Sequence, residues 1–425
     1  MPSSLTELPY NRGLMPLTLD PELRRAVRDA DVLALARDLV RTPSHPGVDQ
    51  QEQRVAHRLA DYLRGAGIEV SLSEVRPGRP NLLARLPTAP NRHAPRPQGT
   101  GRSLLFCGHT DTVAPNALMT IDPFGAEVRD GRLYGRGACD MKGGLAAMAA
   151  ALVALSHIRS PLAGEVSLAA VIDEEMESLG AEALIRSGVK ADGCVVGEPT
   201  ANQVAIAHRG LEWLEVEFTG RATHAGARAE GVNAIAAAAH FIRLLEEELR
   251  PALVLRSHPL VGAPSVNVGA IRGGDHPSTV AARCSVQVDR RWVPGETVEQ
   301  FFTEIEDMLA RVRAGSPGLS TALRRLPGSM ATMVHGPLET APDHPLAAGA
   351  LECRRRVSGA DDTPGAFPAW TDAALLWREA GIPCLVMGPG HLAQAHSADE
   401  WIAVDQLDEA ALQYALLALS FCGPS

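Results

Sequence analysis

The sequence lacks an excess of basic residues. Its 425 residues include 40 lysines and arginines against 50 aspartates and glutamates, which gives a formal net charge of -10. Nucleic acids and anionic membranes are bound by basic faces, so neither is an expected partner. An acidic excess is instead expected of a chain whose carboxylates bind divalent cations.

The sequence also lacks a pairing pattern for its cysteines. There are seven of them and no Cys-x-x-Cys motif. An odd number without such spacing argues against a disulfide framework and favours a reduced, cytoplasmic setting. Cys107 and Cys139 stand beside candidate metal-binding motifs. We nevertheless expect small buried side chains at both positions, because free cysteine is among the most buried residue types.

A long apolar segment is missing as well. Residues 1–20 hold prolines and charges without the apolar core of a signal peptide. The longest run of small apolar residues, 145–155, is much shorter than a membrane span. We therefore expect no signal peptide, no membrane partner and a cytoplasmic location.

What the sequence does contain is an alternation of strand and helix patterns. Apolar runs at 104–106, 166–172 and 194–196 predict strands buried on both faces, and residues 144–155 and 180–187 predict helices between them. Upstream, the predicted elements are helices within 20–40 and at 50–65 and strands at 69–72 and 81–86, with an irregular tail before residue 20 and a proline-rich surface loop at 87–101. This alternation is typical of an α/β fold, in which chemistry lies at the carboxyl ends of the strands.

The pattern changes near residue 211, where polar and apolar residues begin to alternate. The predicted elements are strands at 212–219, 265–271, 283–289 and 320–326, with helices at 231–249 and 296–312. Their order is that of a ferredoxin-like α+β unit. We predict a catalytic domain made of residues 1–210 and 328–425, with residues 211–327 inserted as a second domain. A final helix is expected at 405–421.

Acidic and imidazole side chains gather where the buried strands end. His109 and Asp111 follow the first of these strands, Glu174 and Glu175 follow the second, and Glu198 follows the third. Residues two apart in an extended segment point the same way, so His109 can bind a metal while Asp111 holds its other ring nitrogen. Adjacent residues point opposite ways, so one glutamate of the pair can bind a metal while the other faces the water.

Two further candidates come from outside this strand series. Asp140 lies in a glycine-rich turn, where the backbone can approach closely and a carboxylate can bridge two ions through its two oxygens. His396 lies near the end of the chain. Any one of these residues is commonplace, but their joint placement at strand ends predicts a metallohydrolase with a two-metal site.

These motifs resemble a known family. They are Gly-His-Thr-Asp at 108–111, Gly-Arg-Gly-Ala-Cys-Asp-Met-Lys-Gly-Gly at 135–144, Asp-Glu-Glu at 173–175, Gly-Glu-Pro-Thr at 197–200 and the late His396. In this order they are similar to the zinc-dependent deacylases that include acetylornithine deacetylase and succinyl-diaminopimelate desuccinylase, in a wider family with aminoacylases, dipeptidases and glutamate carboxypeptidases. The resemblance runs from about residue 30 to residue 420 and implies that the inserted domain is a lid and dimerisation domain.

The resemblance also implies roles for the candidate residues. One zinc ion would be held by His109 and Glu198, a second by Glu175 and His396, and Asp140 would bridge them. Glu174 would be the general base, taking a proton from a bridging water whose pKa the ions lower. Asp111 would support His109. The cofactors implied are two divalent ions, most often zinc, with cobalt or manganese as alternatives.

Three residues of the inserted domain are implied as well. His224, in Arg-Ala-Thr-His-Ala-Gly at 221–226, matches a lid histidine that enters the active site of the partner subunit and stabilises the oxyanion. Asn267 and Arg290 fall where lid residues meet the substrate carboxylate. A homodimer formed through the lid is therefore expected.

The motifs leave the substrate open. The segment 388–400 looks most like acetylornithine deacetylase, which favours hydrolysis of the amide bond of a small N-acyl amino acid. A dipeptidase or carboxypeptidase with the same two-metal site is the alternative. A non-catalytic binding protein is a remote third reading, because such relatives should lose the base or a ligand and this chain keeps all of them.

Overall fold

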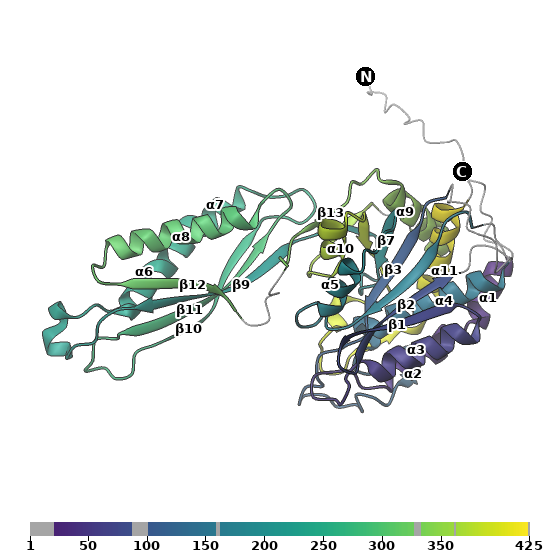
Figure 1. Cartoon of the computed structure of the whole chain (residues 1–425), viewed down its shortest axis with the longest axis horizontal. Coiled ribbons are helices and arrows are strands. Elements are labelled where there is room, and N and C mark those ends of the chain that lie inside the picture. The colour runs from purple at the N-terminus through teal and green to yellow at the C-terminus, as the bar shows by residue number, and fades with distance from the viewer. Residues whose placement is uncertain (1–20, 87–100, 159–161, 327–332, 361–362, 424–425) are drawn as a thin grey trace, which may run out of the picture.

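The computed structural model describes residues 21–86, 101–158, 162–326, 333–360 and 363–423. It consists of two lobes joined side by side into an elongated molecule (Figure 1). One lobe contains the elements before residue 209 and after residue 333, and the other contains those from Gly210 to Arg325. The predicted N-terminal tail, and all of the predicted 87–101 loop except Gly101, lie outside the described residues.

The larger lobe is built on a mixed nine-stranded sheet, counted over the described residues. The strand order is β1-β2-β6-β3-β7-β15-β8-β13, and β14 pairs with β8. The strands are β1 (Glu69–Arg76), β2 (Arg79–Leu86), β3 (Leu104–His109), β6 (Val166–Val171), β7 (Gly193–Val196), β8 (Ala205–His208), β13 (Leu338–Glu339), β14 (Gly365–Phe367) and β15 (Cys384–Val386). The four central strands β6, β3, β7 and β15 are parallel, so their carboxyl ends meet at one edge.

Helices cover both faces of this sheet. Successive β3 residues alternate between two cores: Leu104 and Phe106 pack with α4 and α11, whereas Leu105 and Cys107 pack with α5 and α10. The helices are α1 (Pro21–Asp29), α2 (Val32–Val40), α3 (Gln53–Gly65), α4 (Gly143–His157), α5 (Leu179–Arg186), α9 (Pro345–Ser358), α10 (Ala373–Ala380) and α11 (Val404–Cys422). The expected α/β fold with a buried sheet is confirmed.

The central helix is more apolar than its sequence pattern indicated. Residues Ala138–His157 have the length and hydropathy of a membrane span, but residues 138–155 are buried inside the protein and only Ser156 and His157 reach the surface. A helix surrounded by other elements needs no polar face. All seven cysteines are also buried and free, as expected of small core side chains.

A three-stranded sheet lies beside the main one, in the order β16-β5-β4. Its strands are β4 (Glu127–Arg129), β5 (Arg132–Tyr134) and β16 (Trp401–Ala403). Because β5 precedes the glycine-rich turn with Asp140 and β16 follows the segment with His396, this sheet joins the two motifs that lie outside the strand series.

The smaller lobe has the ferredoxin-like arrangement predicted for it. Its antiparallel sheet has the order β10-β11-β9-β12, formed by β9 (Gly210–Thr219), β10 (Ser265–Gly273), β11 (Arg283–Trp292) and β12 (Ser320–Arg325). Helices α6 (Ala234–Leu244), α7 (Arg250–Val254) and α8 (Val298–Ala314) pack on one face (Figure 1). The predicted helix 231–249 starts later, at Ala234, because the side chain of Asn233 caps it by accepting the Ala236 N–H.

Candidate metal centre

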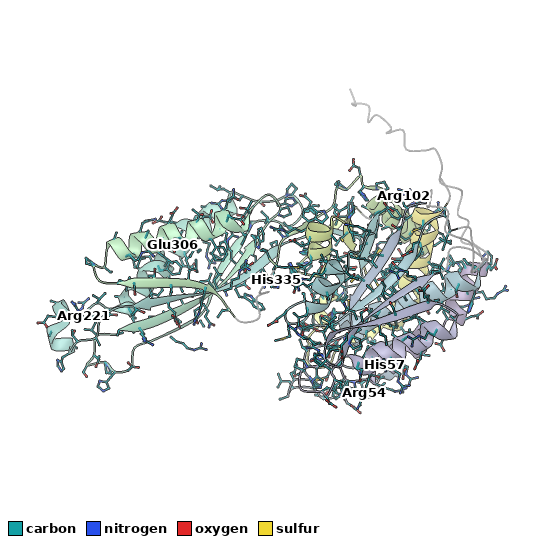
Figure 2. All side chains as sticks on the ribbon, in the orientation of Figure 1. Arg54, His57, Arg102, Arg221, Glu306 and His335 are labelled. Atoms are coloured by element: carbon teal, nitrogen blue, oxygen red, sulfur yellow. The ribbon has the colours of Figure 1, made fainter. Side chains whose placement is uncertain are left out.

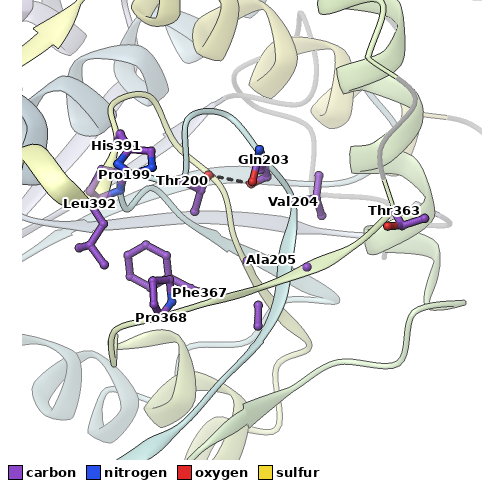
Figure 3. A pocket seen from close by; sticks show the side chains of 12 residues that line it. Pro199, Thr200, Gln203, Val204, Ala205, Thr363, Phe367, Pro368, His391 and Leu392 are labelled. Atoms are coloured by element: carbon purple, nitrogen blue, oxygen red, sulfur yellow. Dashed lines mark hydrogen bonds between the residues drawn. The ribbon is translucent and has the colours of Figure 1, made fainter. Parts of the chain in front are cut away.

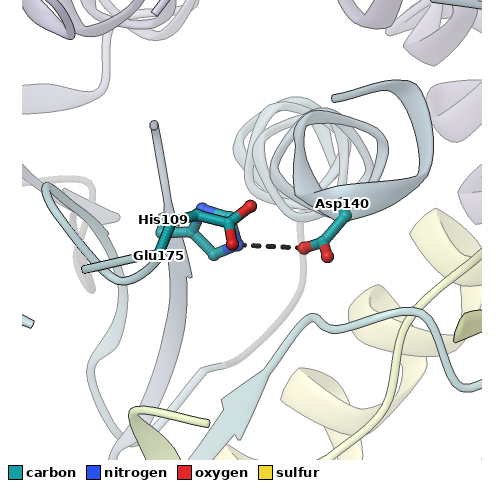
Figure 4. A group of neighbouring side chains, drawn as sticks. All are labelled: His109, Asp140 and Glu175. Carbon is teal, nitrogen blue, oxygen red and sulfur yellow. Dashed lines mark hydrogen bonds and ion pairs between the residues drawn. The ribbon is translucent and has the colours of Figure 1, made fainter. Parts of the chain in front are cut away.

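The candidate ligands converge at the carboxyl edge of the central parallel strands. His109 is the last residue of β3, Glu175 follows β6, and Glu198 follows β7. Asp140 reaches the same place from the irregular turn η1 (Ala138–Lys142), and His396 comes from the segment after β15. Among the described residues, His109, Asp140 and Glu175 lie close enough to one another to share one ion (Figure 4).

The first ligand set surrounds the imidazole of His109. Its Nε2 lies 3.1 Å from Asp140 Oδ1 and 3.7 Å from Glu198 Oε1. Its Nδ1 lies 3.0 Å from the backbone oxygen of Asp111 and 3.5 Å from Asp111 Oδ1. Because two acceptors flank Nδ1, that nitrogen can keep its proton when Nε2 gives up its own and binds an ion next to the carboxylates.

The second ligand set surrounds His396. Its Nε2 lies 3.0 Å from Glu175 Oε2 and 3.4 Å from Asp140 Oδ2. Asp140 therefore presents Oδ1 to one histidine and Oδ2 to the other, which is the arrangement required of a carboxylate that bridges two ions. The five candidate ligands therefore lie together, with Asp140 and Glu198 at His109 and with Asp140 and Glu175 at His396. Their division between two ions stays a prediction.

The spacing of these atoms fits divalent metal ions. Ligand atoms at about 2.0–2.2 Å from a tetrahedral zinc ion lie about 3.3–3.6 Å from one another. The separations of 3.0–3.7 Å fall around this range. A donor set of imidazole nitrogens and carboxylate oxygens suits zinc. Because the oxygens outnumber the nitrogens, the same set also suits cobalt and manganese.

The charges of the site also call for cations. Burial works to raise the pKa of Asp140, but hydrogen bonds to both histidines outweigh it and lower that pKa below its usual range. Hydrogen bonds to Asp140 and Glu175 raise the pKa of His396 to about 10. Burial, with the charge of Asp140 next, raises the pKa of Glu198 well above its usual range. Protons thus compensate the clustered carboxylates here, and metal ions would take over that role by displacing them.

Asp111 holds the turn that carries the two glutamates. Its Oδ1 accepts the backbone N–H of Glu174 at 3.2 Å, and its Oδ2 accepts that of Glu175 at 3.1 Å. Glu175 Oε1 in turn accepts the N–H of Val113 at 3.3 Å. The carboxylate expected to support His109 therefore also sets the position of the turn after β6.

Glu174 has the electrostatics expected of a proton acceptor beside a cation site. Burial raises its pKa well above the usual range, and the charges of Glu198 and Asp372 act in the same direction. Asp372 was not assigned a role from sequence, yet burial and neighbouring acids raise its own pKa to about 7. The sequence signal for Asp372 is its place in the segment Trp-Thr-Asp at 370–372, which precedes α10 and the strand β15.

The lid residues lie apart from this centre. Arg221 is at the far end of the smaller lobe (Figure 2), and His224 lies three residues farther along, where its Nδ1 accepts the Gly226 N–H. His224 is exposed. Asn267 is exposed on β10, directly opposite Asp289 of β11. The structure therefore does not bring His224 to the ligands of its own chain.

Arg290 does not meet the expectation that it is open to a substrate. It lies on the helix-covered face of β11, fully buried, with its guanidinium 2.9 Å from Glu296 Oε1 and over the ring of Phe301. Neighbouring residues of a strand point to opposite faces, so Arg291 lies on the uncovered face, half-buried and paired with Asp289. Of these two neighbouring arginines, Arg291 is the one that the uncovered face presents.

A separate hollow of about 260 Å³ lies next to the turn after β7 (Figure 3). Its walls include Pro199, Thr200, Phe367 and His391. None of the five candidate ligands lines it. We therefore place the chemistry at the ligand cluster, because the lining of this hollow has a single titratable side chain, that of His391, and no partner for it in reactive geometry.

Comparison with known proteins defines the class. The pattern of peptidase family M20/M25/M40 matches residues 105–420, so the chain belongs to this family. It is 32% identical over 375 residues to acetylornithine deacetylase of Vibrio vulnificus, covering 86% of this chain and 90% of the relative. It is 31% identical over 406 residues to acetylornithine deacetylase of Proteus mirabilis, covering 92% and 96%. The chain is a hydrolase by family.

Solved structures share the fold. A tripeptidase of Staphylococcus aureus superposes with a TM-score of 0.72 at 20% identity, covering 91% of this chain and 96% of the other. A dinuclear metal-binding peptidase of the M20 family from Bacillus subtilis gives a TM-score of 0.65 at 16% identity, with coverages of 94% and 98%. These likenesses confirm the α/β fold with a smaller inserted α+β lobe.

Proposed function

We propose that this protein hydrolyses the amide bond of a small N-acyl amino acid, in the manner of an acetylornithine deacetylase, with two zinc ions as cofactors. The observation that carries the proposal is the orientation of the Asp140 carboxylate, whose two oxygens face two different histidines, as a carboxylate that bridges two ions requires. The sequence relatives support the substrate class, because the two described above are acetylornithine deacetylases matched over nearly their whole length.

Glu174 is the general base of the proposed reaction. Bound divalent ions supply a water of lowered pKa and polarise the amide carbonyl. Glu174 takes the proton of the attacking water and returns it to the leaving amine, and its raised pKa in the buried site makes it a stronger base for the first of these transfers. Asp111 keeps Glu174 in place through the backbone bond at 3.2 Å. Glu175 is left to bind metal, since its carboxylate faces His396.

The partner subunit's lid completes the proposed site. His224 is remote from the ligands of its own chain, so its proposed action on the oxyanion needs a second copy, and we propose a homodimer formed through the domain at 211–327. Exposed Ile235 of α6 and Ile271 of β10 support this, because apolar side chains beside an unpaired edge strand suit an interface. Asn267 and Arg291 are the proposed contacts of the substrate carboxylate.

The proposed location is the cytoplasm, supported by seven free cysteines without a disulfide. The proposed domain limits are 1–210, 211–327 and 328–425. The second junction falls within residues 327–332, outside the described residues.

A substrate panel tests the function. The purified protein is loaded with zinc, its metal content is measured, and it is assayed with N-acetylornithine, other N-acetyl and N-succinyl amino acids, and dipeptides. We expect hydrolysis of an N-acyl amino acid with two ions per chain. Preference for dipeptides would replace the deacylase proposal by the peptidase alternative, and hydrolysis of none of them would favour the binding-protein reading.

The base is tested by Glu174→Ala, with Glu177→Ala as the matched control. Glu177 lies in the same turn, but its side chain is exposed. Loss of general-base catalysis costs about 10²–10⁴-fold in rate, so we expect that loss in kcat for the first variant and near-normal rates for the second. A Glu174→Ala enzyme with wild-type kcat would refute the role.

A further inference from the structure

Glu400 is a fully buried carboxylate that touches the backbone of the metal-binding turn. It lies four residues after His396, immediately before β16, and its side chain is 0% exposed. Its own backbone oxygen accepts the N–H of Gly135, at the start of the glycine-rich turn. The segment with one proposed ligand is thus tied directly to the segment with another.

The carboxylate of Glu400 accepts four N–H donors. Oε2 is 2.5 Å from Arg136 Nη1 and 3.1 Å from the backbone nitrogen of Gly137. Oε1 is 2.8 Å from the backbone nitrogen of Cys139 and 3.0 Å from that of Asp140. Both oxygens are therefore used, and one of them bonds directly to the peptide of the bridging ligand.

The turn needs this acceptor. Asp140 and Met141 have non-helical backbone angles inside η1, and Gly137 has a φ of 81°. A backbone of this shape cannot satisfy its N–H groups by regular helical bonds, and a buried N–H without an acceptor is costly. The Glu400 carboxylate provides the acceptor for three such groups, those of Gly137, Cys139 and Asp140.

Arg136 compensates the buried negative charge of Glu400 and adds a second bond to the His396 segment. One of its nitrogens pairs with Glu400, and Nη2 donates to the backbone oxygen of Ser397 at 3.2 Å. Ser397 directly follows His396 in the chain. Arg136 and Glu400 thus form one buried pair that bonds both the Asp140 turn and the His396 segment.

We propose that Glu400 is a positioning residue that sets the bridging geometry of Asp140 and couples it to His396. It is not one of the proposed metal ligands, and it acts by fixing the position of the Asp140 peptide, so that Oδ1 and Oδ2 face the two histidines. The proposal rests on the two-metal site of the proposed function, but it does not depend on which amide is cut.

Glu400→Gln is the sharpest test because it keeps the size of the side chain. Its amide has one acceptor oxygen and one NH₂ group, so in either orientation a donor faces backbone donors or Arg136. Loss of a partner that orients a ligand typically weakens metal affinity about 10–100-fold. We expect that loss in competition with a chelator, together with a changed visible spectrum of the cobalt-loaded protein.

Two further variants complete the experiment. Glu400→Asp withdraws the carboxylate by about 1.5 Å, too far for the bonds to Cys139 and Asp140, so we expect a loss in the same direction even if the glutamine variant does not fold. Glu212→Gln is the control, because Glu212 is also buried and paired with an arginine, Arg325, but lies in the lid sheet. Its metal affinity should match the wild type.

The outcomes separate this inference from the proposed function. Folded Glu400→Gln or Glu400→Asp protein with wild-type metal affinity and an unchanged cobalt spectrum would overturn the positioning role. An equal loss of metal affinity in Glu212→Gln would overturn the positioning role as well, because disrupting a buried ion pair far from the metal centre would then have the same effect. Wild-type protein that binds two ions but cleaves no amide would refute the proposed function alone and leave the test of Glu400 intact.

Discussion

Replacing Asp111 by asparagine removes one acceptor from the turn that carries Glu174 and Glu175. The two carboxylate oxygens of Asp111 each accept one backbone N–H, at 3.2 Å and 3.1 Å, and the side chain is 1% exposed. Asparagine has a single acceptor oxygen, so one of the two N–H groups must face an NH₂ group. A buried donor that loses its acceptor costs about 1–3 kcal/mol.

This cost translates into metal affinity and rate. A free-energy difference of about 1.36 kcal/mol changes an equilibrium or rate constant tenfold. A cost of about 1–3 kcal/mol therefore corresponds to a roughly 5–150-fold loss of metal affinity or rate. The ring orientation of His109 should survive, because its Nδ1 also has the backbone oxygen of Asp111 at 3.0 Å. We therefore expect the loss to act through the displaced Glu174 and Glu175, with about tenfold or more in both zinc affinity and kcat/KM.

The assay compares zinc affinity by chelator competition with kcat/KM on the best substrate of the panel. Asp31→Asn is the control, since Asp31 caps α2 by accepting the Ala34 N–H at an exposed position and asparagine caps helices equally well. A folded Asp111→Asn protein within twofold of wild type in both measurements would refute the reasoning.

Three further predictions concern pH and subunit exchange. Metal affinity should fall as the pH falls below about 10, because His396 has a pKa of about 10 and a bound ion must displace its proton. Chelator competition at several pH values measures this dependence, and an affinity that does not change with pH would contradict it. Burial lowers the pKa of His335 to about 4, so the folded state takes up its proton less readily than the unfolded state. The free energy of unfolding is therefore fully retained above pH 6.5 and falls by up to about 3 kcal/mol as the pH drops from 6.5 through 4. His335→Phe keeps the edge-on packing against Trp370 and should make unfolding less sensitive to acid, which denaturant titrations at pH 7.5 and 4.5 would check against wild type. Mixing His224→Ala with Glu174→Ala protein should restore part of the activity through heterodimers, and mixtures that stay inactive after verified subunit exchange would count against the shared site.

The fold followed from patterns that a linear sequence displays. Continuous apolar runs predicted strands buried on both faces, and β3 indeed alternates between two cores. Period-two alternation after residue 211 predicted a one-sided sheet, and the lid sheet has helices on one face only. Helix limits were less accurate: the start at Ala234 depends on a side-chain cap that hydrophobic spacing does not reveal.

Arg290 shows where such patterns stop. Alternation along β11 separates Arg290 from Arg291, but it does not say which of the two faces the helices cover. Only the packing of α8 decides this, because Phe301 and Glu296 from its region bury Arg290 and leave Arg291 on the other face. The expected substrate contact was therefore one residue away from the arginine that is accessible.

The sequence by itself determined which chemical groups the site can use, because imidazoles and carboxylates at strand ends are local features that the strand pattern locates. It determined neither that the two oxygens of Asp140 face different histidines nor that Glu400 holds the turn beneath them. Apart from the contact between His109 and Asp140, those relations join residues that are more than 250 positions apart, such as Asp140 and Glu400. Hydrogen bonds at about 3 Å depend on how the sheets pack. The tertiary structure alone brings such atoms to bonding distance.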